Sequence, residues 1–233
     1  MKIKHLFPFL FVLFSGCDKV DELPPDITVL KPCENLADSL KVMFPEGKNF
    51  LSNSDFLSDA YQKKIVLIKE AKVFITFIDE GAEYRNTLCW YSYNISQPPS
   101  KVTDIKKSVI FPNISKKDEG GLLEPGYTIQ LGTGIFPTGT VIGFSLILDG
   151  WEDGYINYNK PTHYTDYSFN AGGKQQHILF KKAFLDYIVL GFEDISVLEE
   201  FCDKDFNDVL FAISDNNEGY VATSFDLSNI IIK

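Results

Sequence analysis

The chain has 233 residues, of which 45% are apolar, 23% charged and 14% aromatic, and its formal net charge is −10. This composition is typical of a globular protein and excludes a disordered tail or a collagen-like fibre. Because an acidic surface repels phosphate backbones, we expect no nucleic-acid partner; the charge suits the capture of cations. Four cysteines and three histidines leave little for a disulfide framework or a zinc centre.

The N-terminus has the features of a bacterial lipoprotein signal. Two lysines precede an apolar run, residues 6–16, which is too short to span a bilayer as a helix. The run ends in Ser-Gly before Cys17 and resembles a lipobox, in which the cysteine thiol takes a diacylglycerol group. We expect residues 1–16 to be removed and Cys17 to anchor the chain in a membrane through its acyl chains. The alternative is an ordinary secretory signal in which this cysteine has no role.

The next two segments differ in pattern. Residues 17–33 are charged, contain proline and lack periodicity, so they predict a tether between the lipid and the folded domain. Residues 34–44 place Leu36, Leu40 and Met43 on one helical face, which predicts a short amphipathic helix.

From about residue 63 the sequence consists of short runs rich in β-branched and aromatic residues, separated by glycine, proline and asparagine. Roughly ten such runs without intervening helices predict an all-β fold: an antiparallel, jelly-roll-like β-sandwich that forms a single domain over residues 34–233. The expected strands are residues 65–68, 72–78, 87–93, 108–111, 127–131, 140–148, 155–158, 176–180, 187–192, 209–213 and 220–225.

The most informative stretch covers residues 191–214. Asp203, Asp205 and Asn207 occupy alternate positions, and Asp208 follows directly before an apolar run. Oxygen ligands in this order within a tight loop are typical of sites for hard cations such as Ca²⁺. The loop is not an EF-hand, because the sixth and twelfth positions counted from Asp203 are Asp208 and Ser214 rather than Gly and Glu.

An incomplete loop needs ligands from elsewhere. Glu193 and Asp194 end the preceding strand, and a hairpin would bring them beside residues 203–208. Converging carboxylates repel one another or take up protons unless a cation neutralises them, so we expect a bound Ca²⁺. The alternative is a solvent-facing loop in which Asn207 and Asp208 only cap a turn.

This stretch resembles the signature of the bacterial family called domain of unknown function 4114 and of the related LruC-like domains. Their pattern is Gly-Phe-Glu-Asp, a gap, then Asp-x-Asp-Phe-Asn-Asp and a hydrophobic strand; residues 191–194 and 203–208 match its two parts. Residues 76–86, 120–132 and 139–144 resemble earlier strands and turns, so the resemblance covers about residues 36–213. It implies a β-sandwich of secreted or cell-surface proteins, often thought to bind calcium, with no established activity.

Further acidic and aromatic residues suggest weaker alternatives. Glu80 and Glu83 are possible additional metal ligands, although Arg85 next to them offers an ion-pair partner instead. The acidic residues of segment 149–154 suggest either a second ion or a glycine-rich hairpin turn. The tryptophans and tyrosines at positions 90, 151, 155 and 158 suggest either a sugar-stacking face or core packing.

With Cys17 lipidated, Cys33, Cys89 and Cys202 remain, and their pairing cannot be deduced from spacing. A Cys89–Cys202 bridge next to the acidic loop is one possibility.

No catalytic motif stands out, so we expect no enzyme. The sequence predicts a calcium-binding β-sandwich in the cell envelope, anchored by lipid in the outer membrane and either periplasmic or surface-exposed. Its expected role is surface binding, adhesion or structure, and its protein or glycan ligand is unknown. The alternative is a carbohydrate-binding or glycan-processing envelope component.

Overall fold

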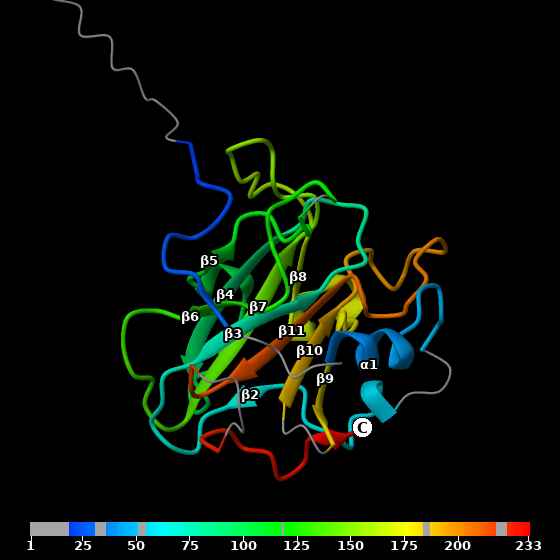
Figure 1. Ribbon diagram of the computed structural model, residues 1–233. Helices are drawn as coiled ribbons and strands as arrows, with labels where there is room; N and C mark the ends of the chain where they lie inside the picture. Colours follow the sequence, from blue (N-terminus) through cyan, green and yellow to red (C-terminus); the bar gives the residue numbers. More distant parts are fainter. Residues whose placement is uncertain (1–18, 31–35, 51–54, 118, 184–186, 218–222) are drawn as a thin grey trace, which may run out of the picture.

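Two β-sheets packed face to face form the fold in the computed structural model (Figure 1), which describes residues 19–30, 36–50, 55–117, 119–183, 187–217 and 223–233. Every strand pair in these residues is antiparallel except β12 with β9. The all-β sandwich predicted from the sequence is therefore confirmed. The larger sheet has the order β1 (Thr28–Val29), β6 (Tyr127–Gln130), β3 (Phe74–Asp79), β11 (Val209–Ser214), β10 (Tyr187–Phe192), β9 (His177–Lys182) and β12 (Ile231–Ile232).

The smaller sheet faces the larger one across the main core. Its order is β2 (Ile65–Val66), β7 (Thr140–Ile147), β4 (Thr87–Asn94) and β5 (Ser108–Phe111), and β8 (Thr162–Tyr164) also pairs with β7. All eight residues of β7 are buried. Phe111 of the smaller sheet stacks on Phe211 of the larger sheet, with 6.3 Å between the ring centres. Large apolar side chains from both sheets thus exclude water from the interior.

A second apolar cluster lies on the other face of the larger sheet, under α1 (Leu36–Met43). Leu36 and Leu40 are fully buried against the sheet, one helical turn apart, while Val42 is 81% exposed. The predicted amphipathic helix is therefore confirmed over the residues described, and positions 34 and 35 lie outside them. Phe206, from the β10–β11 loop, belongs to the same cluster, so the helix and this loop share one core.

Short 3₁₀ turns complete the fold: η1 (Asp55–Leu57), η2 (Val102–Asp104), η3 (Tyr167–Phe169) and η4 (Ala171–Gly173). Among the described helices none is both long and apolar enough to cross a bilayer.

Two predicted strands differ from the structure. Residues 155–158 contain no strand; Ile156 makes only an isolated bridge to Trp151, because Asp153 and Gly154 turn the chain with positive φ. Residues 220–222 lie outside the described part of the chain, and Phe225 makes only an isolated bridge to Leu67. Strands β1, β8 and β12 were not predicted, because runs of two or three residues are too short to show alternation.

The described part of the predicted tether, residues 19–30, is attached to the sandwich. Thr28 and Val29 form β1 and pair with β6, and Leu23 and Ile27 pack against the main core. The backbone N–H of Val20 donates to the Gly154 carbonyl over 2.8 Å. The described part of the predicted tether is therefore packed against the sandwich, while Cys17 and Cys33 lie outside the residues described.

Candidate metal centre

The hairpin between β10 and β11 brings the two halves of the acidic stretch together. Phe192 pairs with Val209 at the end of this ladder, so the two ends of the loop of residues 193–208 lie next to each other. Across it, the Asp194 N–H donates to Asp208 Oδ2 over 2.7 Å. Glu193 and Asp194 therefore lie beside the second half of the motif, as the hairpin argument predicts.

Three of the predicted ligands form what we call the inner cluster: Glu193, Asp194 and Asp208. One carboxylate oxygen from each lies within 4.8 Å of the other two. Glu193 and Asp194 are only 1% and 2% exposed, and Asp208 is partly buried. Such a spacing of oxygen atoms leaves room for one cation between them.

Two other predicted ligands join a residue that the sequence did not indicate. Glu46, Asp203 and Asp205 form the outer cluster, again with one oxygen from each within 4.8 Å of the others. Asp205 is fully buried, whereas Glu46 is exposed. Glu46 follows the end of α1, so this cluster connects the helix segment to the β10–β11 loop. The predicted ligands thus divide between two groups.

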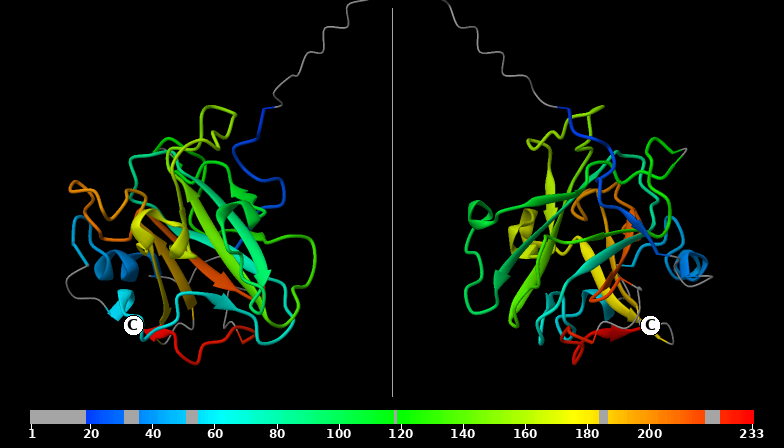
Figure 2. Two further views of the ribbon diagram at one scale, coloured as in Figure 1. Left: turned by 180° about the vertical axis from the view of Figure 1, so that it is seen from behind. Right: turned by 60° about the vertical axis from the view of Figure 1, so that its left-hand side comes forward.

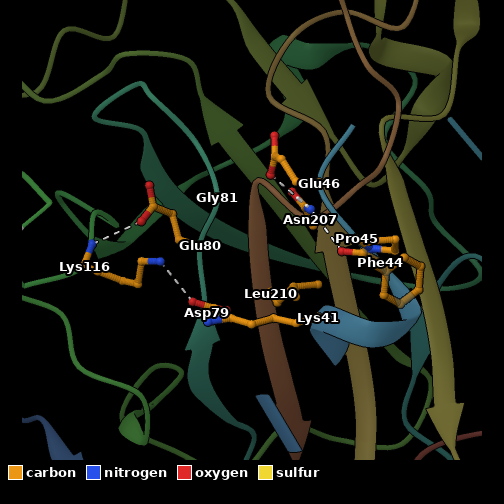
Figure 3. A pocket seen from close by; sticks show the side chains of 10 residues that line it. All are labelled: Lys41, Phe44, Pro45, Glu46, Asp79, Glu80, Gly81, Lys116, Asn207 and Leu210. Carbon is orange, nitrogen blue, oxygen red and sulfur yellow. Dashed lines mark hydrogen bonds and ion pairs between the residues drawn. The ribbon is translucent and has the colours of Figure 1, made fainter. Parts of the chain in front are cut away.

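Asn207 lies beside the outer cluster. Its amide Nδ2 donates to the Phe44 carbonyl over 3.1 Å and to Glu46 Oε2 over 3.4 Å (Figure 3). Its Oδ1 atom is buried and has no hydrogen-bond partner among the described residues. A Cβ on Gly81 would lie 2.9 Å from this oxygen, so the glycine makes room for the asparagine.

Neutral donors hold the carboxylates in place. Glu193 accepts hydrogen bonds from the Phe206 N–H and the Cys202 thiol, each over 3.2 Å. Asp205 accepts from the Gly47 N–H over 2.8 Å and from the Asn207 N–H over 3.1 Å. Among the ion pairs of the described residues, none joins a lysine or arginine to either cluster. The described residues therefore concentrate negative charge here without an ion pair to a lysine or arginine.

The acidities of the carboxyl groups reflect this imbalance. Burial raises the pKa of Glu193 to about 7 and that of Asp194 to about 6. Burial likewise raises the pKa of Asp205 to about 7. The pKa of Asp208 is also raised, first by burial and then by the charges of Asp194 and Glu193. At neutral pH, ionising these carboxyl groups together costs free energy, and a bound cation would remove that cost.

The backbone explains why the motif has this sequence. Lys204 and Phe206 both have positive φ, 64° and 59°, so the loop backbone takes the left-handed conformation at alternate residues. The Phe206 side chain is fully buried in the cluster under α1. A Cβ on Gly191 would lie 2.6 Å from the Phe206 carbonyl oxygen. The motif glycine therefore lets the loop backbone approach β10.

Asn86 and His163 hold Asp194 in place, and the sequence did not indicate either residue as part of the site. Asn86 Nδ2 donates to Asp194 Oδ2 over 2.7 Å, and the Asp149 N–H donates to Asn86 Oδ1 over 2.9 Å. His163 Nε2 lies 2.8 Å from the Asp194 carbonyl oxygen, which makes this nitrogen the protonated one. Asn86 belongs to the turn that resembles the family, but nothing in the sequence connects it with Asp194.

The possible additional ligands lie outside both clusters. Glu80 is 3% exposed, accepts from the Lys116 N–H over 3.3 Å and lines a pocket of about 380 Å³ together with Glu46 and Asn207 (Figure 3). Burial raises the pKa of Glu80 to about 7. Glu83 is exposed. Arg85 pairs with Asp153 rather than with these glutamates.

The structure also bears on the second ion, the sugar-stacking face and the disulfide bridge that the sequence suggests. Lys160 pairs with Asp149 over 2.7 Å, which favours the turn over a second ion at residues 149–154. Trp151 is only 4% exposed and Trp90 is partly buried against Phe136, which favours core packing for both tryptophans, whereas Tyr155 and Tyr158 are 40% and 59% exposed. Cys89 and Cys202 are buried free thiols, so the suggested bridge between them is wrong.

The fold and this loop define an all-β sandwich with a carboxylate-rich hairpin. Residues 136–216 match the family model described as Domain of unknown function (DUF4114). The matched range contains β7 to β11 and the whole loop of residues 193–208, so the resemblance is confirmed there. The wider coverage and the LruC-like resemblance stay predictions. No curated protein and no solved structure matches the chain.

Proposed function

We propose that this chain is a lipid-anchored cell-envelope protein whose sandwich binds Ca²⁺ through the inner cluster. The observation that carries the proposal is the meeting of three carboxylates, two of them almost completely buried, with oxygens within 4.8 Å and no positive partner among the described residues. Burying unpaired charges is expensive, and a divalent cation removes that cost.

The chemistry of the ligands favours calcium over other metals. Both clusters offer only carboxylate oxygens, and hard cations prefer such ligands, whereas zinc prefers histidine and cysteine. Mg²⁺ demands near-ideal octahedral geometry and keeps its water molecules. Ca²⁺ accepts six to eight oxygens in irregular arrangements, which suits ligands from a hairpin loop.

The role we propose for the ion is structural. Glu193 and Asp208 stand at the two ends of the loop, which the β10–β11 ladder brings together, and the ion would hold their carboxylates against each other there. A ligand that binds only the folded state stabilises it by about 2.7 kcal/mol at a hundredfold excess over Kd. The loop also presents exposed side chains, so the ion would hold a binding surface in shape.

The wider function that we propose is binding or adhesion at the cell surface, with a protein or glycan partner. The support is the lipobox-like sequence at Cys17, which suits anchoring in the outer membrane, and the net charge of −10. We also keep the prediction that the chain is not an enzyme.

Titration calorimetry tests the metal proposal. Ca²⁺ is added to chelator-treated protein and to two variants, Glu193→Gln and Glu200→Gln. Glu200 is an exposed residue of the same loop outside both clusters, so its variant is the matched control. We expect binding heat from the wild type and the control, and at least tenfold weaker binding by Glu193→Gln. No heat from the wild type, or equal binding by all three proteins, would overturn the proposal.

A further inference from the structure

An exposed apolar surface lies next to the metal centre. Tyr84, Leu198 and Phe201 are 40%, 51% and 72% exposed, and we call these three residues the apolar patch. They line one pocket of about 400 Å³ together with Leu148, Pro161 and Ile195. Leu198 and Phe201 belong to the same loop as the inner cluster. Exposed apolar patches of this kind mark surfaces that contact something other than water.

The first described residues are bound to the turn that contains Gly154. Val20 donates to the Gly154 carbonyl, and the Lys19 side chain lies beside Gly154. The turn that contains Gly154 also contacts Arg85, because the Trp151 N–H donates to the Arg85 carbonyl over 3.0 Å. Tyr84 of the patch is the next residue. A short series of direct contacts therefore leads from Lys19 to the apolar patch.

The predicted anchor is two residues before the first described residue. Only Asp18 separates Lys19 from Cys17, and two residues of extended chain span at most about 7 Å. Residues 20–29 are attached to the sandwich by the contacts of β1, Leu23 and Val20, so they do not act as a long free spacer. In Figure 1 the first described residues (blue) and the turn of residues 149–156 (yellow-green) lie at the top of the sandwich, and the β10–β11 loop (orange) lies at its right-hand side next to α1, above the C-terminus; Figure 2 shows the same segments from two further sides.

We propose that the apolar patch rests on the phospholipid bilayer to which Cys17 is anchored, so that the metal-centre end of the sandwich faces the membrane. This inference rests on the proposed lipidation of Cys17. An anchor attached a few ångströms from the domain holds the patch at a high effective concentration beside the lipid surface. Leucine and aromatic side chains are favoured at the boundary between headgroups and acyl chains.

The neighbouring charges limit the depth of this contact. Glu199 and Glu200 lie between Leu198 and Phe201 and are exposed, so they stay in the hydrated headgroup layer. The contact is therefore interfacial, and calcium at the inner cluster reduces the repulsion from anionic lipids.

Tryptophan fluorescence in vesicles tests this orientation. The full-length lipidated chain carrying Phe201→Trp is reconstituted into vesicles of phosphatidylethanolamine and phosphatidylglycerol with brominated acyl chains, in saturating calcium. The matched control is Ile232→Trp, at a position 62% exposed on β12. β12 pairs with Phe180 and Lys181 near the C-terminal end of β9. The other end of β9, at His177, pairs with Phe192 beside the β10–β11 loop, so the control lies at the opposite end of the sheet from that loop. The wild type supplies the background of Trp90 and Trp151.

We expect brominated lipid to quench most of the added emission of Phe201→Trp and to leave that of Ile232→Trp unchanged. Leu198→Trp provides an independent probe of the same patch and should behave like Phe201→Trp. A chain that does not float with vesicles overturns the anchor itself, and with it the proposed lipidation. A chain that floats but shows equal or absent quenching at both ends overturns the docking of the patch alone, and favours a protein as the partner of this surface.

Discussion

The backbone N–H of Asp194 donates a 2.7 Å hydrogen bond to the carboxylate of Asp208, which joins the two halves of the acidic motif across the β10–β11 loop. This bond holds the Asp208 carboxylate next to those of Asp194 and Glu193, so it cannot turn away into water to relieve their repulsion. Only protons or a cation can do so.

Removing one inner charge should have opposite effects with and without calcium. Asp208→Asn keeps an oxygen for the Asp194 N–H but removes a buried carboxyl group that must either carry a charge or take up a proton. We expect the metal-free variant to be more stable than the wild type by roughly 1–2 kcal/mol, the value of about one pKa unit. This corresponds to a rise of about 2–8 °C in Tm. The increase in Tm on adding calcium should largely disappear.

Thermal unfolding in chelator and in calcium measures both effects. Glu200→Gln is the control, because it removes one charge from the exposed part of the loop. A metal-free Asp208→Asn protein that melts below the wild type, with its calcium response intact, would contradict the prediction.

The metal-free protein should lose stability as pH rises toward neutrality. Burial raises the pKa of Glu193 from its ordinary 4.5 to about 7, so the folded state binds more protons than the unfolded state between these values. The stabilisation is fully present below pH 4.5 and is lost as pH rises through about 7. Denaturant unfolding in chelator at a series of pH values measures the slope. In Glu193→Gln the slope should be shallower, and an equal slope in both proteins would count against the account.

The strands were predictable where the chain alternates or is fully apolar over several residues. Strands β4, β7, β10 and β11 meet this condition. Residues 155–158 show a similar pattern without forming a strand, since Tyr155 and Tyr158 are 40% and 59% exposed and belong to a turn region. Tertiary context overrides strand propensity there.

The β10–β11 half of the candidate site was predictable because a hairpin brings sequence neighbours together. Glu46 was not, because its meeting with Asp203 and Asp205 joins positions more than a hundred residues apart through the packing of α1. The docking of residues 19–30 escaped prediction for a similar reason. Leu23 and Ile27 are isolated apolar residues in a charged segment and show no periodicity.

Glu46 provides a test of the outer cluster. If this cluster also binds calcium, the wild type should bind two ions per chain and Glu46→Gln one, because the exposed glutamate completes the group of Asp203 and Asp205. Glu83→Gln is the matched control, since Glu83 is exposed and lies in neither cluster. Equilibrium dialysis with radioactive calcium counts the ions. Identical counts for Glu46→Gln and the control would remove Glu46 from the site.

Gly191 should be intolerant of any side chain. In Gly191→Ala the added Cβ would lie 2.6 Å from the Phe206 carbonyl oxygen, so the loop must move. Overpacking of this kind costs about 1–3 kcal/mol, and we expect weaker calcium binding as well. Gly134→Ala is the control, because a Cβ there meets nothing within 4 Å. Denaturant unfolding and calorimetry compare the two variants. Equal free energies of unfolding would contradict the prediction, because they would show that the backbone accommodates the added methyl group without loss of stability.

The most direct test of the central claim is a crystal structure grown in calcium, with the ion located by its anomalous scattering. We predict an anomalous peak enclosed by Glu193, Asp194 and Asp208, with carboxylate oxygens at about 2.3–2.6 Å from the ion. Carboxylates in the same positions without a peak between them, at a calcium concentration that saturates any site of ordinary affinity, would contradict it.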